Sequence, residues 1–188
     1  MQVLNLALGE TALFGYGSLI NRPSLEQTLG RTYDGFFAGC GLRGWERSWD
    51  IAMPNEEFFA EDARGRFYPK HILYLNLRRR PGVVVNGIVF VVDAAALQAF
   101  DRREWIYDRV EVTGDVENVA VSGGRVFAYV GKPEYVCTNV RSPRDAAVRK
   151  SYVAIMESGL EAMDAAFRRD YEQSTEPLPR HLVIADQR

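Results

Sequence analysis

The order of β-type and helical segments is the feature that most constrains the fold of this chain. Runs rich in β-branched and aromatic residues dominate the first two thirds of the sequence, without a helical segment after each run. A doubly wound parallel sheet would require that regular alternation, so a Rossmann fold is disfavoured. We predict an α+β fold with a mixed, mostly antiparallel sheet that closes toward a small barrel with flanking helices.

Short turn signals separate the β-type runs. Strands are predicted at residues 11–16, 71–77, 83–92, 109–113, 116–121 and 125–130. Ser122-Gly123-Gly124 is typical of a tight turn, so the last two strands are expected to form a hairpin. The basic run Arg78-Arg79-Arg80 is followed by Pro81-Gly82, which predicts a solvated turn between strands, with an anion-binding patch as the alternative.

Helices are predicted in three places. One follows Pro23 and ends at Gly30, and a second begins after Asp93, a residue type that caps helix N-termini. The longest is expected to start at Ser142-Pro143 and to extend to Phe167, because apolar residues recur there at helical spacing. Residues 1–188 are predicted to form a single domain, with 176–188 as a surface tail.

The composition limits the partners and the compartment of the protein. Its 23 basic and 25 acidic residues give a formal net charge of -2, so neither nucleic acid nor anionic lipid is expected as a partner. Cys40 and Cys137 have no CxxC spacing and are expected to be reduced thiols, as in the cytoplasm. No apolar run approaches the ~20 residues of a membrane span, and residues 1–8 do not resemble a signal peptide. We expect a soluble, cytoplasmic protein, and no pattern indicates its oligomeric state.

Residues that usually carry metal or nucleophilic chemistry are scarce. His71 and His181 have no second His, Cys or carboxylate at metal-ligand spacing, so neither a metal nor another cofactor is expected. The sequence also has no GxSxG elbow and no Cys/His signature. Catalysis by a nucleophile of the protein itself is therefore disfavoured.

The most unusual local sequence is Phe14-Gly15-Tyr16-Gly17-Ser18-Leu19, at the end of an apolar strand and ahead of a helix. Glycines there let the backbone turn tightly and approach a ligand, which leaves consecutive N–H groups free to bind an anion or a polarised carbonyl. A strand-ending turn without a ligand is equally compatible with the pattern. The lysine of a P-loop and the third glycine of a dinucleotide loop are absent, so a phosphate site is disfavoured.

A second unusual segment, residues 100–112, carries a dense set of charges between a capped helix and a strand. Within it Glu104 precedes Trp105, whose ring is expected to supply an apolar wall that raises the pKa of the carboxyl group. An ion-pair cluster at a helix end is the alternative, because charge runs are usually solvated faces.

Together the two segments resemble the γ-glutamylcyclotransferase family. In that family a strand ends in a [FY]-x-Y-G-S-[LN] loop, and a later LD-x-RE segment supplies a glutamate that is followed by a tyrosine and a strand. Here the first motif spans residues 14–19 and the second spans residues 100–104, followed by Tyr107. The family commonly has a glycine-bearing spacer between the glutamate and the tyrosine, whereas this chain has only Trp105-Ile106.

The resemblance spans about residues 12–160 and implies an activity. The family converts γ-glutamyl peptides or amines into 5-oxoproline and free amine, because the substrate's α-amine attacks its own γ-carbonyl. It implies Glu104 as the acid/base and the N–H groups of residues 16–19 as the binding site of this small-molecule substrate, without metal or cofactor. Tyr129, Arg47 and Arg109 are further candidates for substrate binding. The alternative is a non-catalytic γ-glutamyl-binding protein of the same fold.

Overall fold

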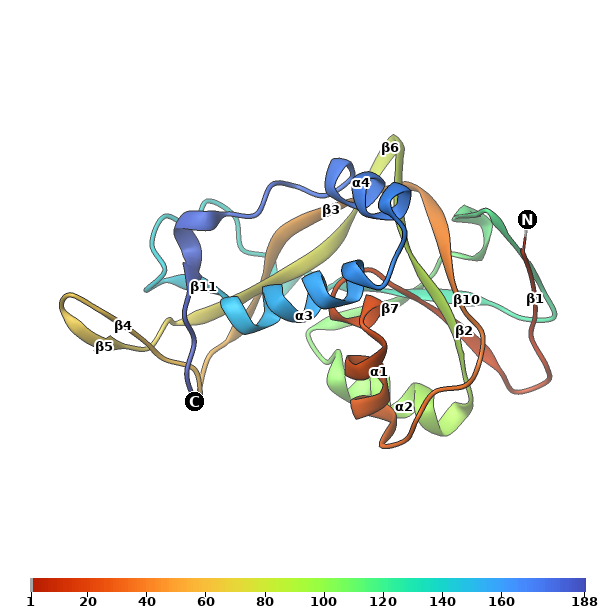
Figure 1. Cartoon of the computed structure of the whole chain (residues 1–188), viewed down its shortest axis with the longest axis horizontal. Coiled ribbons are helices and arrows are strands. Elements are labelled where there is room, and N and C mark those ends of the chain that lie inside the picture. Colours follow the sequence, from red (N-terminus) through yellow and green to blue (C-terminus); the bar gives the residue numbers. More distant parts are fainter. Residues whose placement is uncertain (1) are drawn as a thin grey trace.

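The computed structural model describes residues 2–188 and shows an α+β fold with a strongly curled mixed sheet (Figure 1). Two long strands, β3 (Phe37–Pro54) and β6 (His71–Val92), form its longest pair. The other strands are β1 (Gln2–Asn5), β2 (Thr11–Gly15), β4 (Ala60–Asp62), β5 (Gly65–Phe67), β7 (Tyr107–Glu111), β8 (Val116–Glu117), β9 (Val119–Ser122), β10 (Val126–Gly131), β11 (Ala146–Arg149) and β12 (Val183–Ile184). The α-helices are α1 (Arg22–Leu29), α2 (Ala94–Arg103), α3 (Lys150–Glu161) and α4 (Ala165–Gln173).

Strand β6 organises the sheet because it pairs with different strands along its length. Strand β3 runs antiparallel to most of β6, whereas β2 pairs with residues 88–92 in antiparallel and β11 pairs with His71 and Ile72 in parallel. The sheet continues from β2 to β10 in parallel and from β10 to β7 in antiparallel. The observed architecture is thus the α+β fold with a mixed, curled sheet that the sequence predicted.

Helices cover this sheet and fix the segment that follows β2. A Cβ atom at Gly159 of α3 would lie 2.9 Å from the backbone nitrogen of Asn21, so the glycine permits this close packing. Asn21 caps α1 by accepting a hydrogen bond from the Ser24 N–H at 2.8 Å, and Asp93 caps α2 through the Ala96 N–H at 2.7 Å. The predictions of α1 and α2 are confirmed, and Figure 1 shows the two helices side by side. No helix within residues 2–188 is long and apolar enough to span a membrane.

The predicted long helix from Ser142 to Phe167 was wrong. Residues 146–149 form β11, and helical structure starts at Lys150 and is divided into α3 and α4. The carboxylate of Asp164 starts the second helix by accepting a hydrogen bond from the Phe167 N–H at 2.8 Å. Apolar spacing missed both features, because a short buried strand and the first turn of a helix bury similar residues.

The predicted hairpin around Ser122-Gly123-Gly124 was also wrong. Strand β9 pairs in parallel with β1 in a separate two-stranded sheet, whereas β10 lies between β2 and β7. A bend does form at the glycines, but the strands that it joins enter different sheets.

The predicted turn at Arg78–Gly82 is instead an irregularity within β6. Arg43 pairs with Val84 and Trp45 pairs with Arg79, so residues 80–83 lie opposite a single residue of β3. The basic side chains are largely exposed, as expected, and they form ion pairs with carboxylates on neighbouring segments. The long partner strand β3, which the sequence did not predict, keeps the chain extended through this run.

Residues 176–188, predicted as a surface tail, are built into the fold. Strand β12 pairs with β11, and Leu182 and Ile184 are buried. At the start of this segment the Glu176 carboxylate accepts a hydrogen bond from the Trp49 N–H at 3.0 Å. The two prolines in the segment suggested a loose tail, but they only interrupt its secondary structure.

Arg47 of β3 holds helix α4 against the sheet. It is only 1% exposed, and its guanidinium donates hydrogen bonds to Ser174 Oγ at 2.7 Å, Thr175 Oγ1 at 2.8 Å and the carbonyl oxygen of Tyr171 at 2.9 Å. The guanidinium also lies 3.6 Å from the centroid of the Tyr171 ring and binds Asn86 of β6. This one buried cation therefore ties β3, β6 and α4 together.

Replacing Arg47 with methionine is expected to lower the free energy of unfolding by about 2–5 kcal/mol, because several buried acceptors would lose their donor. Urea denaturation monitored by circular dichroism measures this loss. The matched control is Arg43→Met, on the same strand but exposed, which should cost less than about 1 kcal/mol. Equal losses for the two variants would contradict the anchoring role of Arg47.

Candidate active site

The loop after β2 and the end of α2 meet at a small internal cavity. Strand β2 ends at Gly15, and residues 16–19 then turn into a short 3₁₀ segment, whereas Glu104 is the C-cap of α2. The cavity has a volume of about 30 Å³, and its lining consists of loop residues, aromatic residues and one carboxyl group: Phe14, Tyr16, Gly17, Ser18, Leu19, Leu75, Glu104, Tyr107, Tyr129 and Tyr152. The fold thus brings together the two segments that the sequence singled out.

Two tyrosine hydroxyl groups hold this loop from opposite sides. The Tyr171 hydroxyl of α4 donates to the carbonyl oxygen of Tyr16 at 2.5 Å, and the Tyr16 hydroxyl donates to the carbonyl oxygen of Tyr129 at 2.6 Å. The N–H groups of Gly17, Ser18 and Leu19 make no turn or cap hydrogen bond within residues 2–188. They are therefore available to a ligand, as expected for the first N–H groups of a helical turn.

Close packing at Gly17 leaves no room for a side chain beside Tyr152. A Cβ atom at this position would lie 2.7 Å from the hydroxyl oxygen of Tyr152, a residue of α3 that is itself buried. Any side chain larger than hydrogen at Gly17 must therefore displace the Tyr152 ring. The glycine thus has a steric role that the sequence pattern alone could not distinguish from a simple turn.

Glu104 is a largely buried carboxyl group with one cationic partner. Its side chain is 16% exposed, and its Oε1 lies 3.0 Å from Nε of Arg103. Burial raises the pKa of Glu104, and the Arg103 guanidinium opposes this by lowering it. The expected apolar wall is not Trp105, which is 45% exposed and packs edge-on against Tyr135. Buried tyrosines surround the carboxyl group instead.

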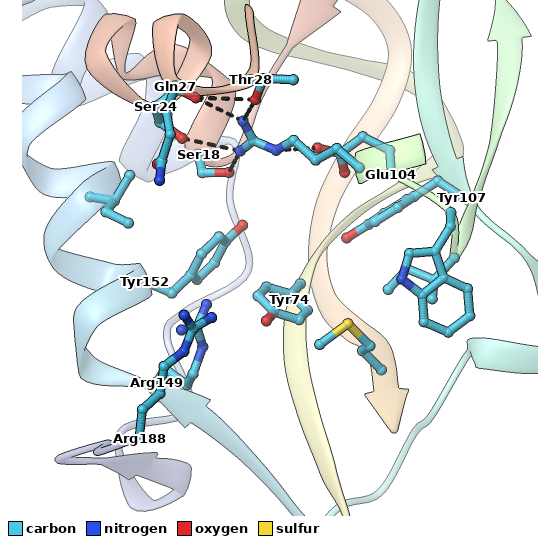
Figure 2. A pocket seen from close by; sticks show the side chains of 15 residues that line it. Ser18, Ser24, Gln27, Thr28, Tyr74, Glu104, Tyr107, Arg149, Tyr152 and Arg188 are labelled. Atoms are coloured by element: carbon cyan, nitrogen blue, oxygen red, sulfur yellow. Dashed lines mark hydrogen bonds and ion pairs between the residues drawn. The ribbon is translucent and has the colours of Figure 1, made fainter. Parts of the chain in front are cut away.

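Arg103 connects the loop, helix α1 and Glu104, a role that the sequence analysis missed. One terminal nitrogen donates to Ser18 Oγ at 2.7 Å and to Ser24 Oγ at 3.1 Å. The other donates to the Ser24 carbonyl oxygen at 2.9 Å and to Thr28 Oγ1 at 2.5 Å, as the dashed lines in Figure 2 show. The arginine next to Glu104 was visible in the sequence, but only the fold shows which neighbouring arginine turns inward.

A larger pocket adjoins the small cavity. It has a volume of about 490 Å³ and shares Ser18, Glu104, Tyr107 and Tyr152 with the small cavity (Figure 2). The rest of its lining comes from α1, β3, β6, the end of α2 and the segment after it, β11, α3 and the C-terminal residue: Ser24, Gln27, Thr28, Met53, Tyr74, Arg103, Trp105, Ile106, Arg149, Ile155 and Arg188. The two spaces form an inner cavity and an outer pocket that meet at Ser18 and Glu104. Within residues 2–188 no group of three or more His, Cys, Asp and Glu side chains is placed to hold a metal ion.

Known structures with the same architecture include cyclotransferases. No protein-family model and no curated protein matches the chain. A γ-glutamyl cyclotransferase matches it with a TM-score of 0.53 at 16% identity, over 90% of each chain. YkqA from Bacillus subtilis gives a TM-score of 0.59 at 16% identity, over 87% of this chain and 53% of that one. A γ-glutamyl cyclotransferase from yeast, described as specific to glutathione, gives 0.51 at 12% identity, over 89% of this chain and 98% of that one. This chain has the γ-glutamyl cyclotransferase fold.

Within this cyclotransferase fold, the predicted site residues fall into two groups. The loop residues 16–19, Tyr129 and Glu104 line the inner cavity, whereas Arg47 and Arg109 line neither the inner cavity nor the outer pocket. Arg109 is paired with Asp101 at 2.8 Å, and Asp101 also accepts a hydrogen bond from the Tyr129 hydroxyl at 2.8 Å. These contacts link α2 to β7 and β10, and so help to position the end of α2, where Glu104 lies.

The two central loop residues should respond differently to substitution. Gly17→Val is expected to lower the free energy of unfolding by about 1–3 kcal/mol, because the new side chain collides with Tyr152. Ser18→Ala removes only an acceptor for Arg103 and should cost about 1 kcal/mol. Urea denaturation of both variants checks this order, and a larger loss for Ser18→Ala would show that the serine hydroxyl matters more than the space at Gly17.

Proposed function

We propose that this chain is a γ-glutamylcyclotransferase-type enzyme that converts γ-glutamyl peptides or amines into 5-oxoproline and a free amine. The observation that carries the proposal is the position of one largely buried carboxyl group, Glu104, which lines the same cavity as the Gly17–Ser18 loop, whose N–H groups make no turn or cap hydrogen bond within residues 2–188. The pair matches a reaction that needs a base and an oxyanion site, and no nucleophile from the protein.

In the proposed reaction the substrate attacks itself. The Glu104 carboxylate accepts a proton from the substrate's α-ammonium group, and the α-nitrogen then attacks the γ-carbonyl carbon. The loop N–H groups stabilise the oxyanion that forms. Glu104 returns a proton to the leaving nitrogen as the bond between the γ-carbon and that nitrogen breaks. The second proton passes from the ring nitrogen to the released amine, so two protons move from the α-nitrogen to the leaving nitrogen in total, and the reaction consumes no water and needs no co-reactant.

The sizes of the two spaces are compatible with this arrangement. The inner cavity, at about 30 Å³, has room for a group the size of a carbonyl or a water molecule. The outer pocket, at about 490 Å³, has room for the remainder of a γ-glutamyl compound. We therefore place the γ-carbonyl where the two spaces meet, at Ser18 and Glu104.

The product identifies the reaction. Purified protein is incubated with glutathione, γ-glutamyl-alanine and a γ-glutamyl amine in ¹⁸O-labelled water, and the products are analysed by mass spectrometry. Unlabelled 5-oxoproline is the expected acid, because the ring nitrogen comes from the substrate and water does not attack. An N-acetylated γ-glutamyl peptide should not react, since its nucleophile is blocked. Labelled glutamate would show hydrolysis, and tight binding without any product would favour the non-catalytic alternative.

Glu104→Gln keeps the size of the side chain and removes its basicity. Turnover is expected to fall by at least ~10²-fold while the protein remains folded, in line with the usual size of acid/base contributions. The matched control is Glu111→Gln, an exposed position on β7, which should retain the activity of the parent protein. Initial rates of 5-oxoproline formation measure both, and full activity in a folded Glu104→Gln protein would remove Glu104 from the reaction.

The dependence of activity on pH should report on Arg103. The base must be ionised, so kcat/KM should rise with pH through the pKa of Glu104. Because Arg103 lowers that pKa, Arg103→Met should raise it and shift the acidic limb of the profile to higher pH. Arg102→Met, at the exposed neighbouring position, is the control and should leave the limb in place. An unshifted limb in Arg103→Met would mean that the titrating group is not Glu104.

A further inference from the structure

Arg149 forms part of the outer pocket wall on the side away from Glu104 and Ser18, with Tyr74 and Tyr152 between them (Figure 2). It is the last residue of β11, where its backbone pairs with β12. Its guanidinium lies 4.0 Å from the centroid of the Phe58 ring and 5.7 Å from that of Tyr74. Arg149 is therefore a fixed part of the pocket and not a flexible surface arginine.

The charge of Arg149 is incompletely paired. Its side chain is only 17% exposed, and the carboxylate with which it pairs, that of Asp186, is 3.8 Å away, beyond hydrogen-bond distance. Asp186 instead binds Ser151, whose N–H donates to Oδ1 at 2.9 Å and whose hydroxyl donates to Oδ2 at 2.5 Å. Within residues 2–188 the Nε of Arg149 has no hydrogen-bond partner, but this atom is itself buried, so the terminal nitrogens are the donors that a ligand in the pocket can reach. The Arg149 guanidinium is shielded from water over most of its surface, and its terminal nitrogens are not fully used by Asp186. Such a group binds a carboxylate strongly.

The other arginines of the outer pocket are engaged elsewhere. Arg103 uses its donors on Ser18, Ser24, Thr28 and Glu104. Arg188 is 72% exposed and is paired with the Glu57 carboxylate at 3.2 Å, so water screens its charge. Among the arginines that line the pocket, Arg149 is thus the one that is both largely buried and incompletely paired.

We propose that Arg149 binds a carboxylate on the leaving amine, so that the substrates are γ-glutamyl amino acids or peptides with a free C-terminal carboxylate and not simple γ-glutamyl amines. This rests on the function proposed above. With the γ-carbonyl between Ser18 and Glu104, the glutamyl part occupies the end of the outer pocket next to these two residues, because the inner cavity has room only for a carbonyl-sized group. The leaving amine then extends through the outer pocket toward Arg149.

Acid and amide forms of the same substrate test this subsite. The kcat/KM for 5-oxoproline formation is measured with γ-glutamyl-alanine and its C-terminal carboxamide, and with glutathione and its C-terminal carboxamide. The acid should be preferred by about 10- to 100-fold in at least one pair, as expected for a hydrogen bond between charged groups. The pair with the larger ratio shows whether one residue or two span the distance to Arg149.

Variants assign the preference to Arg149. Arg149→Met should lower kcat/KM selectively for the acid, so that the ratio of acid to amide falls toward unity, and Arg149→Lys should retain part of the preference. Arg169→Met, an exposed arginine on α4, is the matched control and should leave the ratio unchanged. Thermal unfolding of each variant checks its fold.

The possible failures are distinguishable. Equal kcat/KM for acid and amide in the parent protein would overturn the subsite while leaving the cyclotransferase function intact, and this comparison needs no variant. An equal loss for acid and amide in a folded Arg149→Met protein would also overturn it, because Arg149 would then act on the common glutamyl part or on the fold. Absence of 5-oxoproline from all four compounds would overturn the proposed function, and the subsite with it.

Discussion

The geometry of the site depends on a chain of buried hydrogen bonds that starts at Arg47. The Arg47 guanidinium lies on the Tyr171 ring, the Tyr171 hydroxyl binds the Tyr16 carbonyl oxygen, and the Tyr16 hydroxyl binds the Tyr129 carbonyl oxygen. Every member is buried, so breaking one bond would leave a desolvated polar group. Groups on β3, α4 and β10 thereby fix the loop after β2, and the free N–H groups of the loop owe their direction to this tertiary frame.

Burial and ion pairing shift the pKa of Glu104 in opposite directions. Burial alone would keep the carboxyl group protonated, whereas a fully paired carboxylate would be a weak base. Arg103 gives only part of its hydrogen-bonding capacity to Glu104, because Ser18, Ser24 and Thr28 take the rest. The same arginine that moderates the pKa of the carboxyl group therefore also fixes its position relative to the loop.

The sequence predicted the fold class and both capped helices because these depend on local signals. The turn residues, the Asp93 cap and the density of β-type runs can each be seen within a few residues. Strands β3 and β11 depend on distant partners: β3 is long because β6 pairs with it, and β11 is a strand because it lies between β6 and β12. Local patterns carry no information about such partners.

The site shows the same division between local and distant information. The loop and Glu104 were identified from unusual local sequences, and the structure places both at one cavity. The inward position of Arg103 and the sequestered positions of Arg47 and Arg109 depend on which side chains the fold brings near them. Residue type alone cannot separate these arginines from Arg149, because all four carry the same charge.

What distinguishes Arg149 is how its hydrogen-bond donors are used. Arg47, Arg103 and Arg109 use theirs on protein acceptors, whereas Arg149 lines the outer pocket and its terminal nitrogen is 3.8 Å from its carboxylate partner, Asp186. A guanidinium whose donors are not all used by the protein keeps more free energy for binding an anion, and this difference is the physical basis for proposing different roles for Arg149 and Arg103.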